Sequence, residues 1–131
     1  MGEITISDAH LVDVKSQKYG VTVLNENDHL LRRFGQIDYV ELKAGEKAAI
    51  YRSEADEVWS VVAGEAQIEL KDQRERSPTR GVVEVVDMSG ITPQALLVPF
   101  GVACQIQSEN GGKLIRISTH EDDVSSEDQI L

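Results

Sequence analysis

Five side chains in this sequence are candidates for acid–base or metal chemistry. Tyr51, Ser53 and Glu57 lie close together in the sequence, and Cys104 and His120 follow much later. Glu57 in a dry interior could have a raised pKa and act as a general base, with Tyr51 and His120 completing an acid–base set. As metal ligands, Tyr51 and Ser53 are weak, so we expect no metal; Glu57, Cys104 and His120 form the alternative metal set.

The elements that must position these residues are predicted to be β-strands. Short runs rich in Val, Ile, Leu and Tyr are separated by Gly, Pro, Asn, Asp and Ser, and helical periodicity is limited to a turn at 28–33. This pattern predicts an all-β sandwich or barrel. The expected strands are 4–6, 11–14, 20–24, 36–42, 48–52, 57–62, 66–70, 82–87, 95–99, 103–107 and 114–118.

Alternation within these runs separates buried faces from exposed ones. Ala66, Ile68 and Leu70 share one face of their strand, which predicts that this face is buried. Within 36–42, Gln36 and Asp38 lie on the opposite face from Ile37, Tyr39 and Glu41, and either face could line a pocket. Turns are expected at Gly45, Gly64, Gly101 and Gly111–Gly112, and Asn110–Gly111 predicts a hairpin.

Size and charge bound the function. The 131 residues suit one domain, taken here as 1–120, followed by an acidic, solvated tail at 121–131. The formal charge of -10 disfavours nucleic acid and anionic membranes and leaves a small ligand or a protein partner. One cysteine excludes an intrachain disulfide, and neither a signal peptide nor a spanning apolar run is apparent, so we expect a soluble, cytoplasmic protein.

Two motifs resemble those of the cupin superfamily, whose fold is a double-stranded β-helix, or jelly-roll barrel. The first cupin motif, G-x5-H-x-H-x3-4-E-x6-G, and the core of the second, P-x-G-x2-H, have counterparts here. These are Gly45-x5-Tyr51-x-Ser53-x3-Glu57-x6-Gly64 and Pro99-x-Gly101-x2-Cys104. The resemblance implies a single cupin barrel in which Tyr51, Ser53 and Cys104 stand where metal-binding histidines usually lie.

A second resemblance points to one branch of the cupins. Residues 72–81 match the D-x-R-x-x-S-P-T-x-G segment of dTDP-4-dehydrorhamnose 3,5-epimerases, and 61–65 are similar to their V-V-x-G-E. That family implies a barrel, usually dimeric, that binds a deoxysugar nucleotide in its mouth. It epimerises carbons beside a ketone without a metal, using a base, an enolate-stabilising cation and an acid.

The resemblance also implies that this chemistry has been altered. Tyr51 stands in place of the family's catalytic histidine, Glu57 in place of its lysine, and Cys104 in place of a second histidine. His120 lies near the position of the acidic tyrosine. An unperturbed tyrosine is a poor base near neutral pH, and a negative charge at Glu57 would oppose an enolate.

Binding without the usual catalysis is therefore the first functional hypothesis. In this hypothesis the ligand is a small carbohydrate-derived molecule, such as a nucleotide sugar. The protein is expected to be a homodimer and to need no cofactor. The second is a diverged, metal-independent keto-sugar isomerase or epimerase that uses Tyr51, Glu57 and His120, and the third is a structural partner subunit. Trp59 either packs the core or stacks on a sugar. Arg74 either is solvated or binds a diphosphate or an acidic partner. The predicted ligand-binding residues are Gln36, Tyr51, Ser53, Glu57, Trp59, Arg74 and Cys104.

Overall fold

The computed structural model describes residues 4–18, 20–24, 30–31, 34–48, 50–52 and 55–119. At positions 16, 20, 51 and 52 it describes the backbone alone. Ser53, His120, the tail at 121–131 and most of the helical turn expected at 28–33 lie outside the described residues. The described chain is all-β and forms one antiparallel domain, as the sequence predicts.

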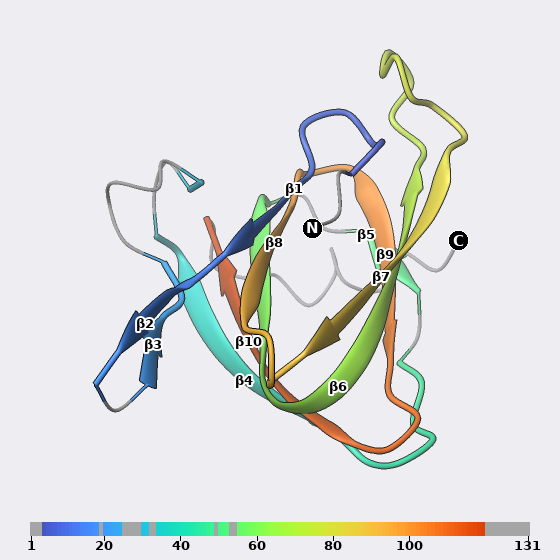
Figure 1. Cartoon of the computed structure of the whole chain (residues 1–131). Coiled ribbons are helices and arrows are strands. Elements are labelled where there is room, and N and C mark those ends of the chain that lie inside the picture. Colours follow the sequence, from blue (N-terminus) through green and yellow to red (C-terminus); the bar gives the residue numbers. More distant parts are fainter. Residues whose placement is uncertain are drawn as a thin grey trace.

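The strands curl into a barrel in which β6 belongs to both walls (Figure 1). One wall has the order β1-β8-β6-β10-β4, and in the other wall β6 pairs with β7 and β9, and β9 pairs with β5. A separate hairpin joins β2 to β3. The bounds are β1 His10–Asp13, β2 Lys15–Gln17, β3 Gly20–Thr22, β4 Gln36–Leu42, β5 Tyr51–Arg52, β6 Glu57–Asp72, β7 Val83–Ser89, β8 Gln94–Val98, β9 Val102–Gln107 and β10 Gly112–Ser118.

Gly64 bends β6 instead of ending it, so the prediction of two strands separated by a turn at this residue is wrong. Residues 57–64 pair with β8 and β10, whereas 65–72 pair with β7 and β9. Gly64 has a φ of 74°, and a Cβ there would lie 2.2 Å from the carbonyl oxygen of Gly111. A glycine lets the strand cross between the walls because it tolerates both the positive φ and the close contact.

Other differences from the sequence prediction occur at the amino-terminal side. Residues 4–6 form no strand; the backbone N–H groups of Thr5 and Ile6 instead donate to the carboxylate of Glu84, at 2.7 and 3.1 Å. The short strand β2 is absent from the sequence prediction. Most of the remaining strands lie within a few residues of their predicted bounds. The prediction of a hairpin at Asn110–Gly111 is wrong, because the turn there connects two strands of different walls: β9 pairs with β5 and β6, whereas β10 pairs with β4 and β6.

The core fills the barrel from both walls. Ala66, Ile68 and Leu70 are completely buried, which confirms the face predicted from their alternation. They belong to one apolar cluster that also contains Trp59 and Cys104. No helix long and apolar enough to cross a membrane occurs among the described residues.

Candidate polar site inside the barrel

A row of polar side chains interrupts the apolar inner face where β4, β10 and β6 pair. Gln36, Asp38 and Val40 are partly buried, whereas Ile37 and Tyr39 between them are 57 and 61% exposed. The face that contains Gln36 and Asp38 therefore points into the barrel, a choice that the sequence left open. The strand register places Asp38 opposite Arg116, and Arg116 opposite Trp59.

Arg116 holds this row together. Its Nε donates to Glu57 Oε2 at 2.7 Å, its Nη2 forms an ion pair with the same carboxylate, and its Nη1 donates to Asp38 Oδ2 at 2.7 Å. Gln36 Nε2 lies 3.0 Å from both oxygens of Asp38, and Trp59 Nε1 donates to Glu57 Oε1 at 3.3 Å. These five side chains, on three strands, form one connected hydrogen-bond network, here called the interior network.

The interior network is buried at one end and accessible to solvent at the other. The side chains of Glu57 and Arg116 are 1 and 6% exposed, whereas that of Asp38 is 33% exposed. Buried charges are costly unless they are paired and hydrogen-bonded, and Arg116 supplies that pairing to Glu57. Asp38 therefore belongs to the accessible side of the network, where a ligand could contact it.

Arg116 and Asp38 are not among the residues that the sequence predicts to be catalytic or ligand-binding. Both are detectable from strand parity, because Arg116 shares its parity with Leu114, which is completely buried. Asp38 likewise shares its parity with Gln36, which is predicted to bind ligand. Parity within one strand does not reveal a charge partner, and the pairing of Arg116 with Glu57 joins residues 59 positions apart.

The predicted residues of the two cupin motifs lie on neighbouring strands. Tyr51 on β5 pairs in register with Cys104 on β9, so the structure brings the two motifs side by side. Cys104 is 2% exposed and Trp59 is also 2% exposed, which places both in the core. Because Ser53, His120 and the side chain of Tyr51 are not described, their roles stay predictions.

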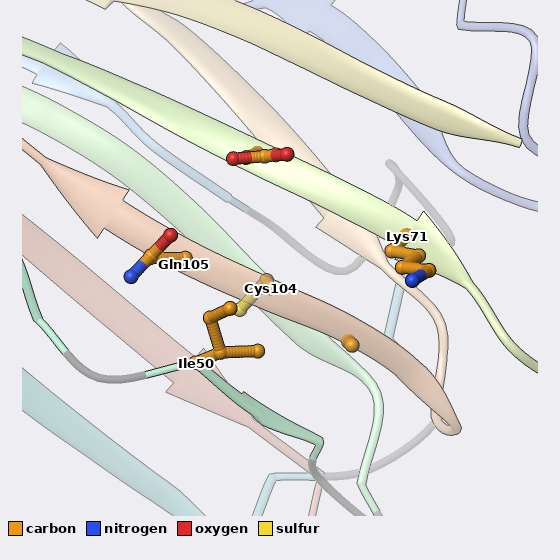
Figure 2. Close-up of a pocket in the computed structure, with 6 residues that line it drawn as sticks. Ile50, Lys71, Cys104 and Gln105 are labelled. Atoms are coloured by element: carbon orange, nitrogen blue, oxygen red, sulfur yellow. The ribbon is translucent and has the colours of Figure 1, made fainter. Parts of the chain in front are cut away.

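A small hollow lies beside Cys104 (Figure 2). It is lined by Ile50, Glu69, Lys71, Ala103, Cys104 and Gln105 and has a volume of about 70 Å³. Pockets for small molecules usually measure about 300 to 1,000 Å³, so this hollow is too small for a sugar ring. The interior network is the better candidate for a ligand site.

Arg74 lies in a structural cluster at the end of β6. Asp72, which is completely buried, accepts hydrogen bonds from Arg74 Nε at 2.9 Å, Ser77 Oγ at 2.5 Å and Thr79 Oγ1 at 2.6 Å. Arg74 Nη2 also donates to the carbonyl of Ser7 at 2.7 Å, and Nη1 forms an ion pair with Asp8 at 3.5 Å. The D-x-R-x-x-S-P-T segment thus closes its own loop and fastens residues 7–8 to it.

The charge state of Asp72 follows from these contacts. Burial disfavours its ionised form, but the hydrogen bonds from Arg74, Ser77 and Thr79 outweigh burial and hold the pKa of Asp72 well below its usual value. The same bond to Asp72 raises the pKa of Arg74. A diphosphate at Arg74 would have to compete with these contacts, and its binding there stays a prediction.

Metal binding has no support among the described side chains. No three His, Cys, Asp or Glu residues of the described ranges lie close enough together to hold a metal ion. The alternative set of Glu57, Cys104 and His120 includes a residue outside those ranges and is untested.

Comparison with known structures identifies the fold. A dTDP sugar isomerase of Desulfovibrio desulfuricans G20 superposes with a TM-score of 0.82 at 19% identity, over 92% of this chain and 82% of that one. The RmlC dTDP-6-deoxy-D-glucose-3,5-epimerase of Legionella pneumophila, in complex with dTDP-4-keto-L-rhamnose, gives 0.82 at 20% identity, over 95 and 73%. The chain has the RmlC-like cupin fold. A third neighbour, the dTDP-4-dehydrorhamnose 3,5-epimerase of Bacillus anthracis, gives 0.80 at 18%, over 95 and 79%.

A sequence relative adds a biological context to this RmlC-like cupin. The spore coat polysaccharide biosynthesis protein SpsL of Bacillus subtilis strain 168 is 37% identical over 82 residues, which are 62% of this chain and 54% of that protein. The match therefore spans about half the length of the relative. No family model matches the chain. The cupin resemblance stated from the sequence is thus confirmed at the level of fold.

Proposed function

We propose that this RmlC-like cupin binds a small carbohydrate-derived ligand, such as a nucleotide sugar, in the mouth of its barrel and acts in the synthesis of a polysaccharide. The observation that carries the proposal is the interior network. Apolar residues of similar volume often stabilise a core as well as a buried ion pair does, so a network that ends in a part-exposed Asp38 suits recognition. The solved neighbours and the spore coat relative support the ligand class.

A ligand screen tests this proposal. The purified, EDTA-treated protein is heated with nucleotide sugars, free sugars or divalent metals, and its melting temperature is recorded. A ligand that binds only the folded state raises that temperature, and at 100 times its Kd it stabilises by about 2.7 kcal/mol. A shift with a sugar or nucleotide sugar supports the proposal. An unchanged melting temperature with every class of ligand contradicts the proposal and favours the partner-subunit hypothesis.

A second candidate function is a diverged keto-sugar isomerase or epimerase. Glu57 takes the position of the family's lysine, and the favouring observation is that Arg116 brings a cation back to within 2.7 Å of this residue from another strand. In this reaction a base removes the proton beside the ketone, a cation stabilises the enolate oxygen, and an acid returns a proton to the other face. Tyr51, Glu57 and His120 are the proposed acid–base residues, and no metal or other cofactor takes part.

Solvent deuterium exchange distinguishes catalysis from binding. Incubation of dTDP-4-keto-6-deoxyglucose with the protein in deuterated water should introduce deuterium beside the ketone if the isomerase hypothesis holds. The Glu57→Gln variant should lose that exchange. Unchanged exchange in this variant would exclude Glu57 as the base, whereas binding without exchange would leave the first proposal as the function.

A homodimer that works in the cytoplasm is also proposed. The strand β4 forms an edge of its wall, and its outer face presents Ile37 and Tyr39 at 57 and 61% exposure. Exposed apolar edge strands invite pairing with another chain. The chain's one cysteine is buried, which suits a reducing compartment.

A further inference from the structure

The charges of the interior network are unequal. Arg116 contributes one positive charge, and Glu57 and Asp38 contribute one negative charge each when ionised. The guanidinium donates from Nε and Nη2 to Glu57 on one side and from Nη1 to Asp38 on another. An arginine engaged by two carboxylates is poorly placed to receive an anionic group as well.

Asp38 differs from Glu57 in that it retains acceptor capacity on the open side. It accepts from the Nε2 amide of Gln36, which lies 3.0 Å from both carboxylate oxygens, and from Nη1 of Arg116, which contacts Oδ2. A carboxylate can accept about four hydrogen bonds, so Oδ1 can accept another donor. With a third of the side chain exposed, that donor can come from a ligand.

We infer that Asp38 determines the ligand specificity of the interior network, selecting a sugar that presents a hydrogen-bond donor, above all a protonated amino group, over one that presents a carbonyl or an anion. This inference rests on the proposed carbohydrate-binding function and names the ligand class of the same site. A charged donor pairs with the part-exposed carboxylate of Asp38 and adds a hydrogen bond at Oδ1. A carbonyl has no proton to donate and would face the carboxylate with its negative end.

Three matched ligands test the inference by titration calorimetry. They are dTDP-4-amino-4,6-dideoxyglucose, dTDP-6-deoxyglucose and dTDP-4-keto-6-deoxyglucose. These differ at carbon 4, the carbon that bears the keto group in the ligand of the Legionella epimerase. We expect affinity to fall in that order, with the amino sugar bound about tenfold or more tightly than the keto sugar, the gain typical of a charge-assisted hydrogen bond.

The variant Asp38→Asn separates this effect from general binding, because it keeps the shape of the side chain and removes its charge. The preference for the amino sugar should fall to about threefold or less, while dTDP-6-deoxyglucose should still bind. Asp87→Asn, on the exposed outer face of β7, is the matched control and should keep the full preference. Far-UV circular dichroism confirms folding of each variant. If the Asp38→Asn variant does not fold, Asp38→Glu, which keeps the charge, should retain a preference for the amino sugar.

The outcomes are distinguishable. Equal affinities, or tighter binding of the keto sugar, overturn the specificity of Asp38 while leaving the carbohydrate-binding proposal intact. An amino preference that survives in the folded Asp38→Asn variant also overturns it. Failure of all three ligands and of dTDP itself to bind overturns the proposed function, and this inference with it.

Discussion

Arg116 on β10 and Glu57 at the beginning of β6 form a buried ion pair, with Nε of the arginine 2.7 Å from Oε2 of the glutamate. The two residues are diagonal neighbours across the strand pair, since Arg116 is opposite Trp59 and Glu57 is opposite Ser118. Diagonal neighbours lie within reach of long side chains on the same face of a sheet. The pair thus gives Glu57 a countercharge in a position where the related epimerases are expected to have a lysine.

Removing one partner of this pair should destabilise the protein strongly. Arg116→Met removes the arginine partner of a carboxylate that is 1% exposed, so we expect a loss of about 3 to 5 kcal/mol in the free energy of unfolding. The double variant Arg116→Met, Glu57→Leu removes both charges and should recover a large part of that loss. Urea denaturation of the four proteins in the cycle measures the coupling, and simple additivity of the two single variants would contradict the pairing.

The cluster around Asp72 should make stability fall in acid. Because the pKa of Asp72 is depressed in the folded state, its contribution is fully present above its ordinary value of 3.8 and is lost as the pH falls below that value toward the folded pKa. Urea denaturation between about pH 6 and pH 2.5 should therefore show a steep acid limb. In Asp72→Asn that limb should become shallower, and stability at neutral pH should fall by about 2 to 3 kcal/mol.

Asp87→Asn is the control for that experiment, because Asp87 lies exposed on β7. Its unfolding free energy should follow that of the parent protein across the pH range. If the Asp72 and Asp87 variants had the same acid limb, the Asp72 cluster would not be the source of the acid sensitivity.

Comparing alanine substitutions at Gly64 and Gly45 separates the cost of backbone strain from the cost of steric overlap. Both have positive φ, 74 and 80°, but a Cβ at Gly64 would meet the oxygen of Gly111 at 2.2 Å, whereas a Cβ at Gly45 would meet nothing within 4 Å. Gly45→Ala should cost about 1 to 2 kcal/mol from the left-handed backbone. Gly64→Ala should cost clearly more, because the strand must also move away from Gly111 in the turn that connects β9 to β10. Equal losses in thermal or urea denaturation would mean that this contact relaxes freely.

The thiol of Cys104 should be unreactive toward thiol reagents in the folded protein. The thiol is buried in the core, and buried structural cysteines are inert toward reagents that attack exposed thiolates. We expect its reaction with Ellman's reagent to be slower by a factor of about 100 or more than in the urea-unfolded chain. Rapid stoichiometric labelling of the native protein would instead indicate an accessible, reactive thiol.

The outer face of β4 should govern self-association. If the proposed dimer uses this edge, Tyr39→Lys places a charge in the interface and should raise the dimer dissociation constant about tenfold or more. Val85→Lys on β7, where the parent residue is 57% exposed, is the matched control and should leave association unchanged. Light scattering after size-exclusion chromatography measures both. A monomeric parent protein, or an unchanged Tyr39 variant, would exclude this interface.

Much of the fold is predictable because strand formation depends on local alternation. The run 36–42 forms a strand with the predicted bounds, and the buried face of Ala66, Ile68 and Leu70 follows from a period of two. The spacing of the cupin motifs predicts the barrel itself, since Tyr51 and Cys104 do pair across neighbouring strands. These properties reside in short stretches of sequence.

The tertiary structure decided what no single stretch contains. The sequence predicts that a strand ends at Gly64, yet the positive φ of this residue serves a bend that brings it against Gly111. The sequence leaves Arg74 either solvated or ligand-binding, and the structure places it against Asp72 and Ser7.

The pairing of Arg116 with Glu57 and Asp38 was also decided by the tertiary structure. The sequence determined which residues alternate into the barrel, because the pleat of a strand fixes that period locally. Which charge meets which across the barrel was decided by the strand order β6-β10-β4, since register between distant strands arises only when the walls close around a common core.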